Sequence, residues 1–279
     1  RAFHTNWDKV KRTGILTIDV GDKIGLSKII LFDPISGLKF SHEFRPMLEF
    51  DGEQPFFSNN GQWLLFGEDR WINARQLSTG KTWSLIDKYN NYEWNHTLSV
   101  NNDVFVMSDY YNALAVYKFP TMEYIFEEKG SNSDRGPIDI SPDGKFIATA
   151  KREEGGVSIL NLETKKWIMQ LDNPGGKIYN LEFNPGGNFL LIAAIDYYGD
   201  NRSEIYNLET QRSAGIMTTL DNLLFHPTLN AICYSSNKQK QITVRSLDNE
   251  QVIYLIDYPN NLKNCTDICI SSDGKYIAV

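Results

Sequence analysis

Ile140-Ser-Pro-Asp-Gly144-Lys-Phe-Ile-Ala148 is the clearest copy of a phrase that recurs along this chain of 279 residues. An apolar residue precedes a four-residue polar turn, and an apolar segment follows the turn. Pro142 presets φ at the second turn position and Gly144 accepts a positive φ, so the phrase predicts a tight turn between two strands. Close copies are Phe57-Ser-Asn-Asn-Gly61-Gln-Trp-Leu-Leu65, Phe183-Asn-Pro-Gly-Gly187-Asn-Phe-Leu-Leu191 and Ile270-Ser-Ser-Asp-Gly274-Lys-Tyr-Ile-Ala278.

The spacing of these copies predicts the architecture. Looser copies begin at Leu98 and Phe225, and a fainter one begins at Val10. The steps are 47, 41, 42, 43, 42 and 45 residues between Val10, Phe57, Leu98, Ile140, Phe183, Phe225 and Ile270. This is the period of a four-stranded propeller blade. We therefore expect an all-β fold, a seven-bladed β-propeller of four-stranded antiparallel blades.

The repeat favours one domain over residues 1–279 rather than two. The expected blades are approximately 1–48, 49–90, 91–130, 131–173, 174–218, 219–260 and a partial blade 261–279. The last repeat reaches only its second strand at Val279. We therefore expect an incomplete seventh blade in a chain cut from a longer one.

One repeat illustrates the expected strands, which we call A to D in chain order. Residues 138–140 alternate apolar and polar, 146–150 run apolar, 157–162 alternate again, and 166–171 follow a polar turn. Strand B carries little polarity, which is typical of a strand buried on both faces. The expected C-strand ends step by 43, 42, 43, 46 and 39 residues through Pro34, Leu77, Phe119, Leu162, Leu208 and Leu247. The turn phrases and the C-strand ends thus recur with the same period.

These C-strand ends carry a resemblance to a known family. Ile29-Ile-Leu-Phe-Asp33, Val157-Ser-Ile-Leu-Asn161-Leu162 and Ile205-Tyr-Asn-Leu208 resemble the closing phrase of WD40 repeats, and a polar turn follows each copy. No repeat has the family's Trp-Asp dipeptide at this place. The resemblance spans nearly the whole chain, and it implies a closed propeller that acts as a scaffold in a larger assembly.

Composition argues against several functions. The net charge of −7 disfavours broad binding to nucleic acid, whose partners concentrate Lys and Arg on one face. Three cysteines, Cys233, Cys265 and Cys269, do not resemble the framework of a disulfide-stapled secreted domain, which favours the cytoplasm but leaves the compartment open. No apolar run approaches about 18 residues, so we expect no membrane span.

The sequence offers no catalytic constellation. It contains no Gly-x-Ser-x-Gly elbow, phosphate-cradling glycine loop or His-Glu-x-x-His motif, and we expect no cofactor or metal. The four histidines share no register, and His226 occupies a turn position, where we expect it in solvent rather than as a general base. Propeller enzymes can gather single residues from several blades, so this absence weakly disfavours an enzyme.

The loops carry the strongest functional signal. In a propeller, the D-to-A and B-to-C loops open on one face, which we call the loop face, and loops on a rigid scaffold commonly carry function. Aromatic residues concentrate in these expected loops, beside charged residues, and Asp-Tyr-Tyr occurs twice. Tyr and Trp are typical interface anchors, although local packing at strand ends is an equal alternative for each single tyrosine. The candidate contact residues are Tyr89, Tyr92, Trp94, Asp109, Tyr110, Tyr111, Asp196, Tyr197, Tyr198, Arg202 and Tyr258.

The resulting hypothesis is a non-catalytic WD40-like scaffold that binds a protein or peptide through its loop face. Two other classes stay open. The first is enzymatic: a hydrolase or lactonase working in a central channel, or a propeller that gates a larger peptidase or hydrolase. The second is a purely structural propeller within a multidomain array.

Overall fold

The computed structural model describes most of the chain as strands and the short turns that join them. The described residues are 2–8, 13–19, 27–33, 37–44, 56–58, 62–68, 71–86, 95–98, 103–108, 114–128, 135–151, 156–172, 175–218, 221–259, 262–265, 268–271 and 273–279. No helix occurs among these residues. Contacts divide the chain into two compact units, Arg1–Ser131 and Asn132–Val279. The expected turn at Val10 lies outside the described residues.

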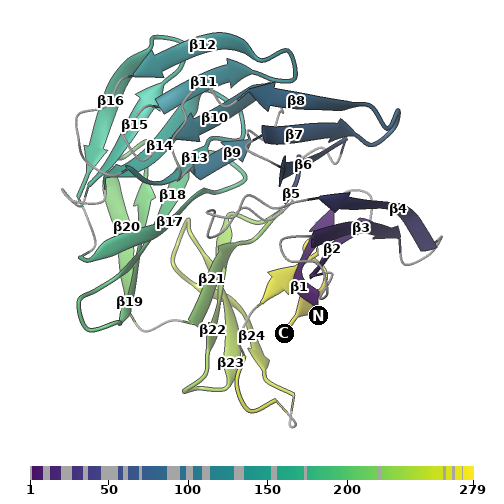
Figure 1. Cartoon of the computed structure of the whole chain (residues 1–279). Coiled ribbons are helices and arrows are strands. Elements are labelled where there is room, and N and C mark those ends of the chain that lie inside the picture. Colours follow the sequence, from purple (N-terminus) through teal and green to yellow (C-terminus); the bar gives the residue numbers. More distant parts are fainter. Residues whose placement is uncertain are drawn as a thin grey trace. The chain divides into compact units, whose positions relative to one another are not determined.

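The first unit contains three four-stranded antiparallel sheets, in which the strands are neighbours in chain order (Figure 1). The first sheet consists of β1 (Ala2–Asp8), β2 (Thr13–Asp19), β3 (Ser27–Asp33) and β4 (Gly37–Phe44). The second consists of β5 (Phe56–Phe57), β6 (Trp63–Glu68), β7 (Trp71–Gln76) and β8 (Thr82–Ile86). The third consists of β9 (Asn95–Leu98), β10 (Val104–Ser108), β11 (Leu114–Lys118) and β12 (Glu123–Glu128).

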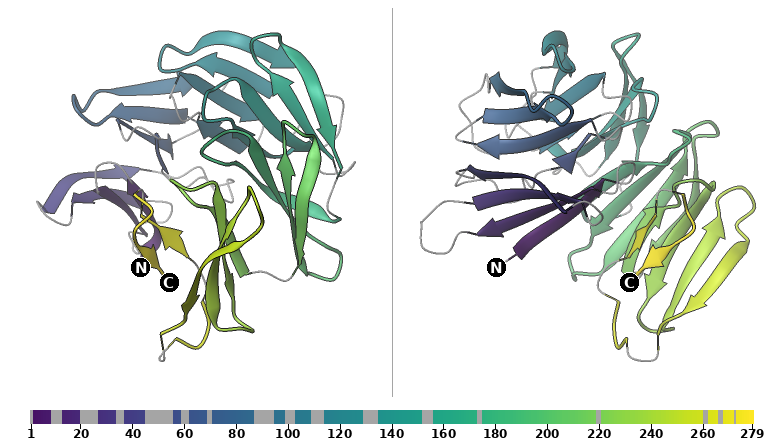
Figure 2. Two further views of the ribbon diagram at one scale, coloured as in Figure 1. Left: turned by 180° about the vertical axis from the view of Figure 1, so that it is seen from behind. Right: turned by 90° about the vertical axis from the view of Figure 1, so that its right-hand side faces the viewer.

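The second unit contains three further four-stranded sheets and one two-stranded sheet, and the views in Figure 2 show each sheet as a twisted ribbon. The fourth sheet consists of β13 (Arg135–Ile140), β14 (Phe146–Lys151), β15 (Val157–Asn161) and β16 (Lys166–Leu171). The fifth consists of β17 (Lys177–Phe183), β18 (Phe189–Ile195), β19 (Asn201–Asn207) and β20 (Arg212–Thr218). The sixth consists of β21 (Asp221–Phe225), β22 (Ala231–Ser236), β23 (Gln241–Ser246) and β24 (Val252–Asp257). The seventh consists of β25 (Cys269–Ile270) and β26 (Ile277–Ala278).

The sheet predicted by the repeat, an antiparallel four-stranded meander, is thus confirmed in six places. Such sheets have the form of propeller blades. The predicted C-strand ends also follow one pattern, because the residue after β15, Leu162, donates its backbone N–H to Lys145 O at 2.8 Å, and Leu208 donates to Asn188 O at 2.8 Å. Equivalent bonds join Leu77 to Gln62, Phe119 to Asp103 and Leu247 to Asn230.

The A-to-B turns owe their shape to a side-chain acceptor at their first position. Ser141 Oγ accepts the backbone N–H of Phe146 at 2.9 Å and donates to the Asp143 carboxylate at 2.6 Å. Gly144 has the predicted positive φ, 72°. Asn184 serves the same purpose in the next sheet, where its Oδ1 accepts the N–H of Phe189 at 2.8 Å. The turns therefore satisfy backbone donors with their own side chains, without help from other sheets.

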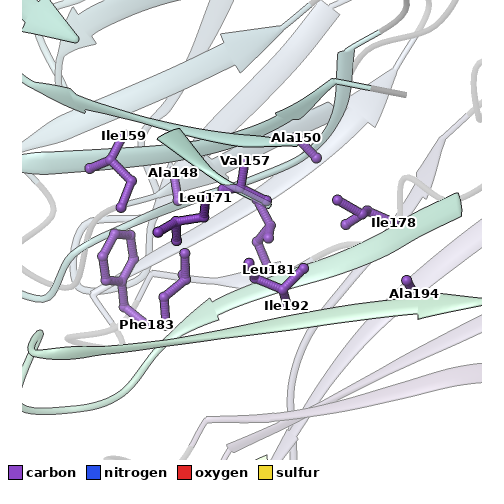
Figure 3. Packing of buried hydrophobic residues seen from close by; sticks show 11 residues of the cluster. Ala148, Ala150, Val157, Ile159, Leu171, Ile178, Leu181, Phe183, Ile192 and Ala194 are labelled. Atoms are coloured by element: carbon purple, nitrogen blue, oxygen red, sulfur yellow. The ribbon is translucent and has the colours of Figure 1, made fainter. Parts of the chain in front are cut away.

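The core between the fourth and fifth sheets explains the apolar B strands. In β18, the residues from Phe189 to Ala194 are all buried, as the pattern predicts for a strand covered on both faces. Figure 3 shows Val157 and Leu171 of the fourth sheet in one cluster with Leu181 and Phe183 of the fifth. Burial of these large side chains is the main stabilising contribution at this contact.

A β-bulge recurs in the outermost strand, D, of five of the six four-stranded sheets. In each case the strand carries one extra residue relative to strand C: Lys39, Ile125, Ile168, Ala214 and Ile253. Ile168 and Ala214 are 46 residues apart, as are Leu162 and Leu208. The bulges increase local twist, and they show that the period seen in the sequence is also a period of backbone geometry.

Candidate interaction loops

The best-defined candidate loop joins β18 to β19 and contains Asp196, Tyr197 and Tyr198. Asp196 Oδ1 accepts the backbone N–H groups of Tyr198 at 2.9 Å and Asp200 at 3.0 Å. The backbone N–H of Asp196 donates to Asp200 O at 3.0 Å, and Gly199 has φ 86°. A carboxylate that accepts two backbone donors holds the loop in one conformation.

Arg202, near the start of β19, also binds the Asp196 carboxylate. Its Nε and Nη2 each lie 3.1 Å from Asp196 Oδ2. The hydrogen bond from the Asp200 backbone lowers the pKa of Asp196; desolvation opposes this effect, whereas Tyr198 N–H and the charge of Arg202 reinforce it. Asp196 therefore binds both the guanidinium of Arg202 and the backbone of the loop.

Tyr197 and Tyr198 project from this loop into solvent. Their side chains are 96% and 86% exposed, the largest values among the exposed apolar and aromatic residues of the described chain. Their ring centroids are 5.8 Å apart and the ring planes meet at 86°. Neither hydroxyl has a hydrogen-bond partner among the described residues. Packing over strand ends, the alternative explanation for aromatic loops, does not account for rings this exposed.

A D-to-A loop lies against the base of the Tyr197–Tyr198 loop. A Cβ on Gly176 would overlap the carbonyl oxygen of Ile195 and come within 2.7 Å of Asp196 Cα. Gly175 approaches Arg202, since a Cβ there would lie 3.5 Å from its Nη1. The two loop types thus meet at one end of this sheet, as the expected topology requires.

The sixth sheet has the same juxtaposition of loops, with different chemistry. Asn237, between β22 and β23, accepts the backbone N–H of Cys265 at 2.7 Å and donates to Cys265 O at 3.0 Å. Tyr258 is buried, and its hydroxyl donates to Asn237 Oδ1 at 3.3 Å. Lys240 Nζ donates to Lys263 O and to Asn264 Oδ1. Of the predicted contact residues, Tyr258 is therefore part of the packing in this region.

The remaining predicted contact residues, Tyr89, Tyr92, Trp94, Asp109, Tyr110 and Tyr111, lie outside the described residues. Of the members of that set that the structure describes, Asp196, Tyr197, Tyr198 and Arg202 lie together in the loop described above.

The expectation for His226 is wrong, because its side chain is buried rather than solvated. Its Nδ1 accepts the backbone N–H groups of Leu229 at 3.1 Å and Thr228 at 3.3 Å. Burial lowers the pKa of His226, although a hydrogen bond to the Gly274 backbone opposes this. The imidazole joins a turn of the sixth sheet to a turn of the seventh and is a structural group.

The sequence analysis did not identify Asp139 as a carboxylate with a raised pKa. Its Oδ2 accepts the backbone N–H of Phe183 at 2.7 Å and so joins β13 to β17. Desolvation raises the pKa of Asp139 to about 7, although hydrogen bonds from the backbone of Phe183 and Ile140 act in the opposite direction. The signal was its place between Ile138 and Ile140, both of which are buried.

The described residues contain no group of three or more His, Cys, Asp and Glu side chains arranged to hold a metal ion. Cys233 and Cys265 are buried and Cys269 is exposed, and all three are free thiols. Burial, with a smaller contribution from Cys265, raises the pKa of Cys233 to about 11, which makes its thiolate scarce at neutral pH. Within the described chain, no helix has the length and hydropathy of a membrane-spanning segment.

Comparisons with known proteins identify similarity in fold only. No protein-family model matches the sequence, and no curated protein matches it. A chain in the crystal structure of the mitotic checkpoint complex is similar with a TM-score of 0.67 and 12% identity, over 98% of this chain and 82% of that one. A chain of Kuenenia stuttgartiensis hydrazine synthase is similar with a TM-score of 0.65 and 11% identity, over 99% of this chain and 91% of that one.

Proposed function

We propose that this chain is a seven-bladed, WD40-like propeller that binds a protein or peptide through the loop face, without catalysis. The observation that carries the proposal is the Tyr197–Tyr198 pair, which is almost fully exposed on a loop braced by Asp196 and Arg202. The successive four-stranded sheets support the propeller, as do the similar solved structures.

The loop suits binding because its order does not depend on the two rings. Asp196 satisfies the backbone of the loop, so the tyrosines are presented in a fixed place before any partner arrives. A partner then loses little affinity to ordering of this surface. Tyrosine also contributes apolar area and a polar tip, which is why it is frequent among interface hot spots.

The proposal extends to the second Asp-Tyr-Tyr phrase, Asp109-Tyr-Tyr111, which occupies the equivalent B-to-C position in another repeat. Two such loops on one face would give a partner two aromatic anchors. Tyr89, Tyr92 and Trp94 belong to the same proposed face. Tyr258 does not, because it is buried.

Affinity capture followed by mass spectrometry tests the proposal. The bait is the whole chain, compared with the double variant Tyr197→Ala/Tyr198→Ala and with Tyr276→Ala. This control removes a 72% exposed tyrosine from the turn before β26. We expect a partner that the wild type and the control retain and the double variant loses. A partner list shared by all three baits would contradict the proposal.

Thermal unfolding separates binding from packing in the same variants. The two rings contact each other and solvent, so their removal should leave the melting temperature nearly unchanged. A large loss of stability in the double variant would assign the tyrosines a packing role instead. The corresponding variant Tyr110→Ala/Tyr111→Ala then asks whether the second loop contributes to the same partner.

A further inference from the structure

Among the described charged side chains near the Tyr197–Tyr198 pair, some form an ion pair and others do not. Arg202 directs its guanidinium to Asp196, so this positive charge is already paired. Asp200, in the same loop, and Asp172, the first residue of the adjacent D-to-A loop, are exposed. Lys177 is the exposed cation at the start of β17. Among the described residues of these two loops, two carboxylates and one cation remain without an ion pair.

The rings themselves favour a cation. Aromatic faces carry negative charge density, and a guanidinium or ammonium group placed over a face is attracted to it. The planes of Tyr197 and Tyr198 meet at 86°, so the pair presents faces in two perpendicular directions. Both rings are almost fully exposed, which leaves these faces open to a side chain from another molecule.

We infer that the Tyr197–Tyr198 pair receives an arginine or lysine side chain from an exposed basic segment of the partner. This inference rests on the proposed function and names the chemistry of its partner. The cation stacks on a tyrosine face, and the carboxylates of Asp200 and Asp172 attract it from the sides. The net charge of −7 on the whole chain adds long-range attraction for a basic segment.

Other partner chemistries fit this surface less well. An acidic segment would meet Asp200 and Asp172, which have no ion pair among the described residues, and like charges at an interface reduce affinity. A purely apolar anchor would need a surrounding apolar surface, whereas the loop offers mainly Ile195 beside the rings. Carboxylates beside exposed aromatic faces are the combination that suits a cation.

Four labelled peptides test the inference on the intact chain. They share one Gly-Ser framework and differ only in two positions, which hold Arg, Lys, Leu or Glu. Fluorescence anisotropy gives their affinities, and NMR of ¹³C-labelled tyrosine rings, with Tyr197→Phe and Tyr198→Phe for assignment, locates the contact. We expect the Arg and Lys peptides to bind and to shift the Tyr197 and Tyr198 signals.

The variants give the expected magnitudes. Tyr197→Ala/Tyr198→Ala should weaken the Arg peptide about tenfold, equivalent to about 1.4 kcal/mol. Tyr197→Phe/Tyr198→Phe should bind nearly as the wild type, because it retains both ring faces. The control Tyr276→Ala should also bind normally, although it removes a tyrosine that is 72% exposed.

Two results would overturn the inference: equal or tighter binding of the Leu peptide, or an affinity for the Arg peptide that the double Ala variant leaves unchanged. The two proposals can fail separately. A captured partner that depends on the tyrosines but contacts them through an apolar or acidic segment would preserve the proposed function and refute the basic segment.

Discussion

At the residue scale, Asp139 links stability to pH. Its pKa is about 7 in the folded chain against an ordinary value of 3.8, because burial disfavours the carboxylate. The folded state therefore retains a proton that the unfolded state has released over this interval. The free energy of unfolding should fall as pH rises from about 4 to about 7, by at most roughly 4 kcal/mol, and be constant above that range.

Asp139→Asn isolates this contribution, since the amide oxygen can still accept the Phe183 N–H without carrying a charge. We expect the variant to be more stable than the wild type at pH 8 and to lose this part of the pH dependence. Urea unfolding across the pH range measures both effects, with the exposed Asp172→Asn as control. Parallel pH profiles for wild type and Asp139→Asn would show that the carboxylate titrates normally.

Residue type predicted a positive φ at some turn residues but not at others. Gly144, Gly187 and Gly274 have φ of 72°, 73° and 71°, as the turn phrase implies. The C-to-D turns repeat a different left-handed position, held by Gly80, Met122, Lys165, Gln211 and Glu250. Only one of these residues is glycine, so composition gave no signal. L-residues other than glycine adopt this left-handed conformation at a cost, so residue type did not indicate it.

At the scale of elements, the contact between neighbouring loops depends on Gly176. Its φ is 123°, and any Cβ would overlap the Ile195 backbone. Gly176→Ala should therefore displace the D-to-A loop from the base of the tyrosine loop. We expect a loss of more than about 2 kcal/mol in the free energy of unfolding, since backbone cannot move aside as a flexible side chain can.

Gly215 is a matched control for this substitution. Its φ is 133°, and a Cβ there would have no heavy atom within 4 Å. Gly215→Ala thus measures the cost of the backbone conformation alone, and the difference between the two variants in urea unfolding measures the close approach. Equal destabilisation by both substitutions would mean that the two loops can separate without loss.

Elements were more predictable than their contacts. The alternation and turn phrases anticipated the A-to-D order of strands because both depend on local chemistry. Contacts between elements arise from residues distant in sequence, such as Asp139 with Phe183 and Asn237 with Cys265. The turn position of His226 predicted a solvent-exposed side chain, yet the side chain is buried against the neighbouring sheet. The loop position of Tyr197 and Tyr198 was enough to predict their exposure. The burial of Tyr258 could not be predicted in this way, because it involves a contact with Asn237.

At the scale of the whole molecule, we predict that the strand β24 mediates self-association. It is the outer strand of its sheet, and all six residues are exposed. Val252, Ile253, Tyr254, Leu255 and Ile256 are 40–60% exposed. The outer strand β12 has glutamates at both ends, and β16 begins with Lys166 and contains Gln170. Charged residues on edge strands limit pairing between molecules, and β24 lacks them before Asp257.

We expect association that increases with protein concentration and that Ile253→Lys reduces. The control is Ile168→Lys, because Ile168 occupies the same bulge position in β16 and is 48% exposed, against 40% for Ile253. Light scattering over a range of concentrations, with thermal unfolding to verify that each variant folds, distinguishes them. If both lysines reduce association equally, the effect is one of net charge. A reduction by Ile253→Lys alone assigns the association to β24, where five consecutive apolar residues are exposed.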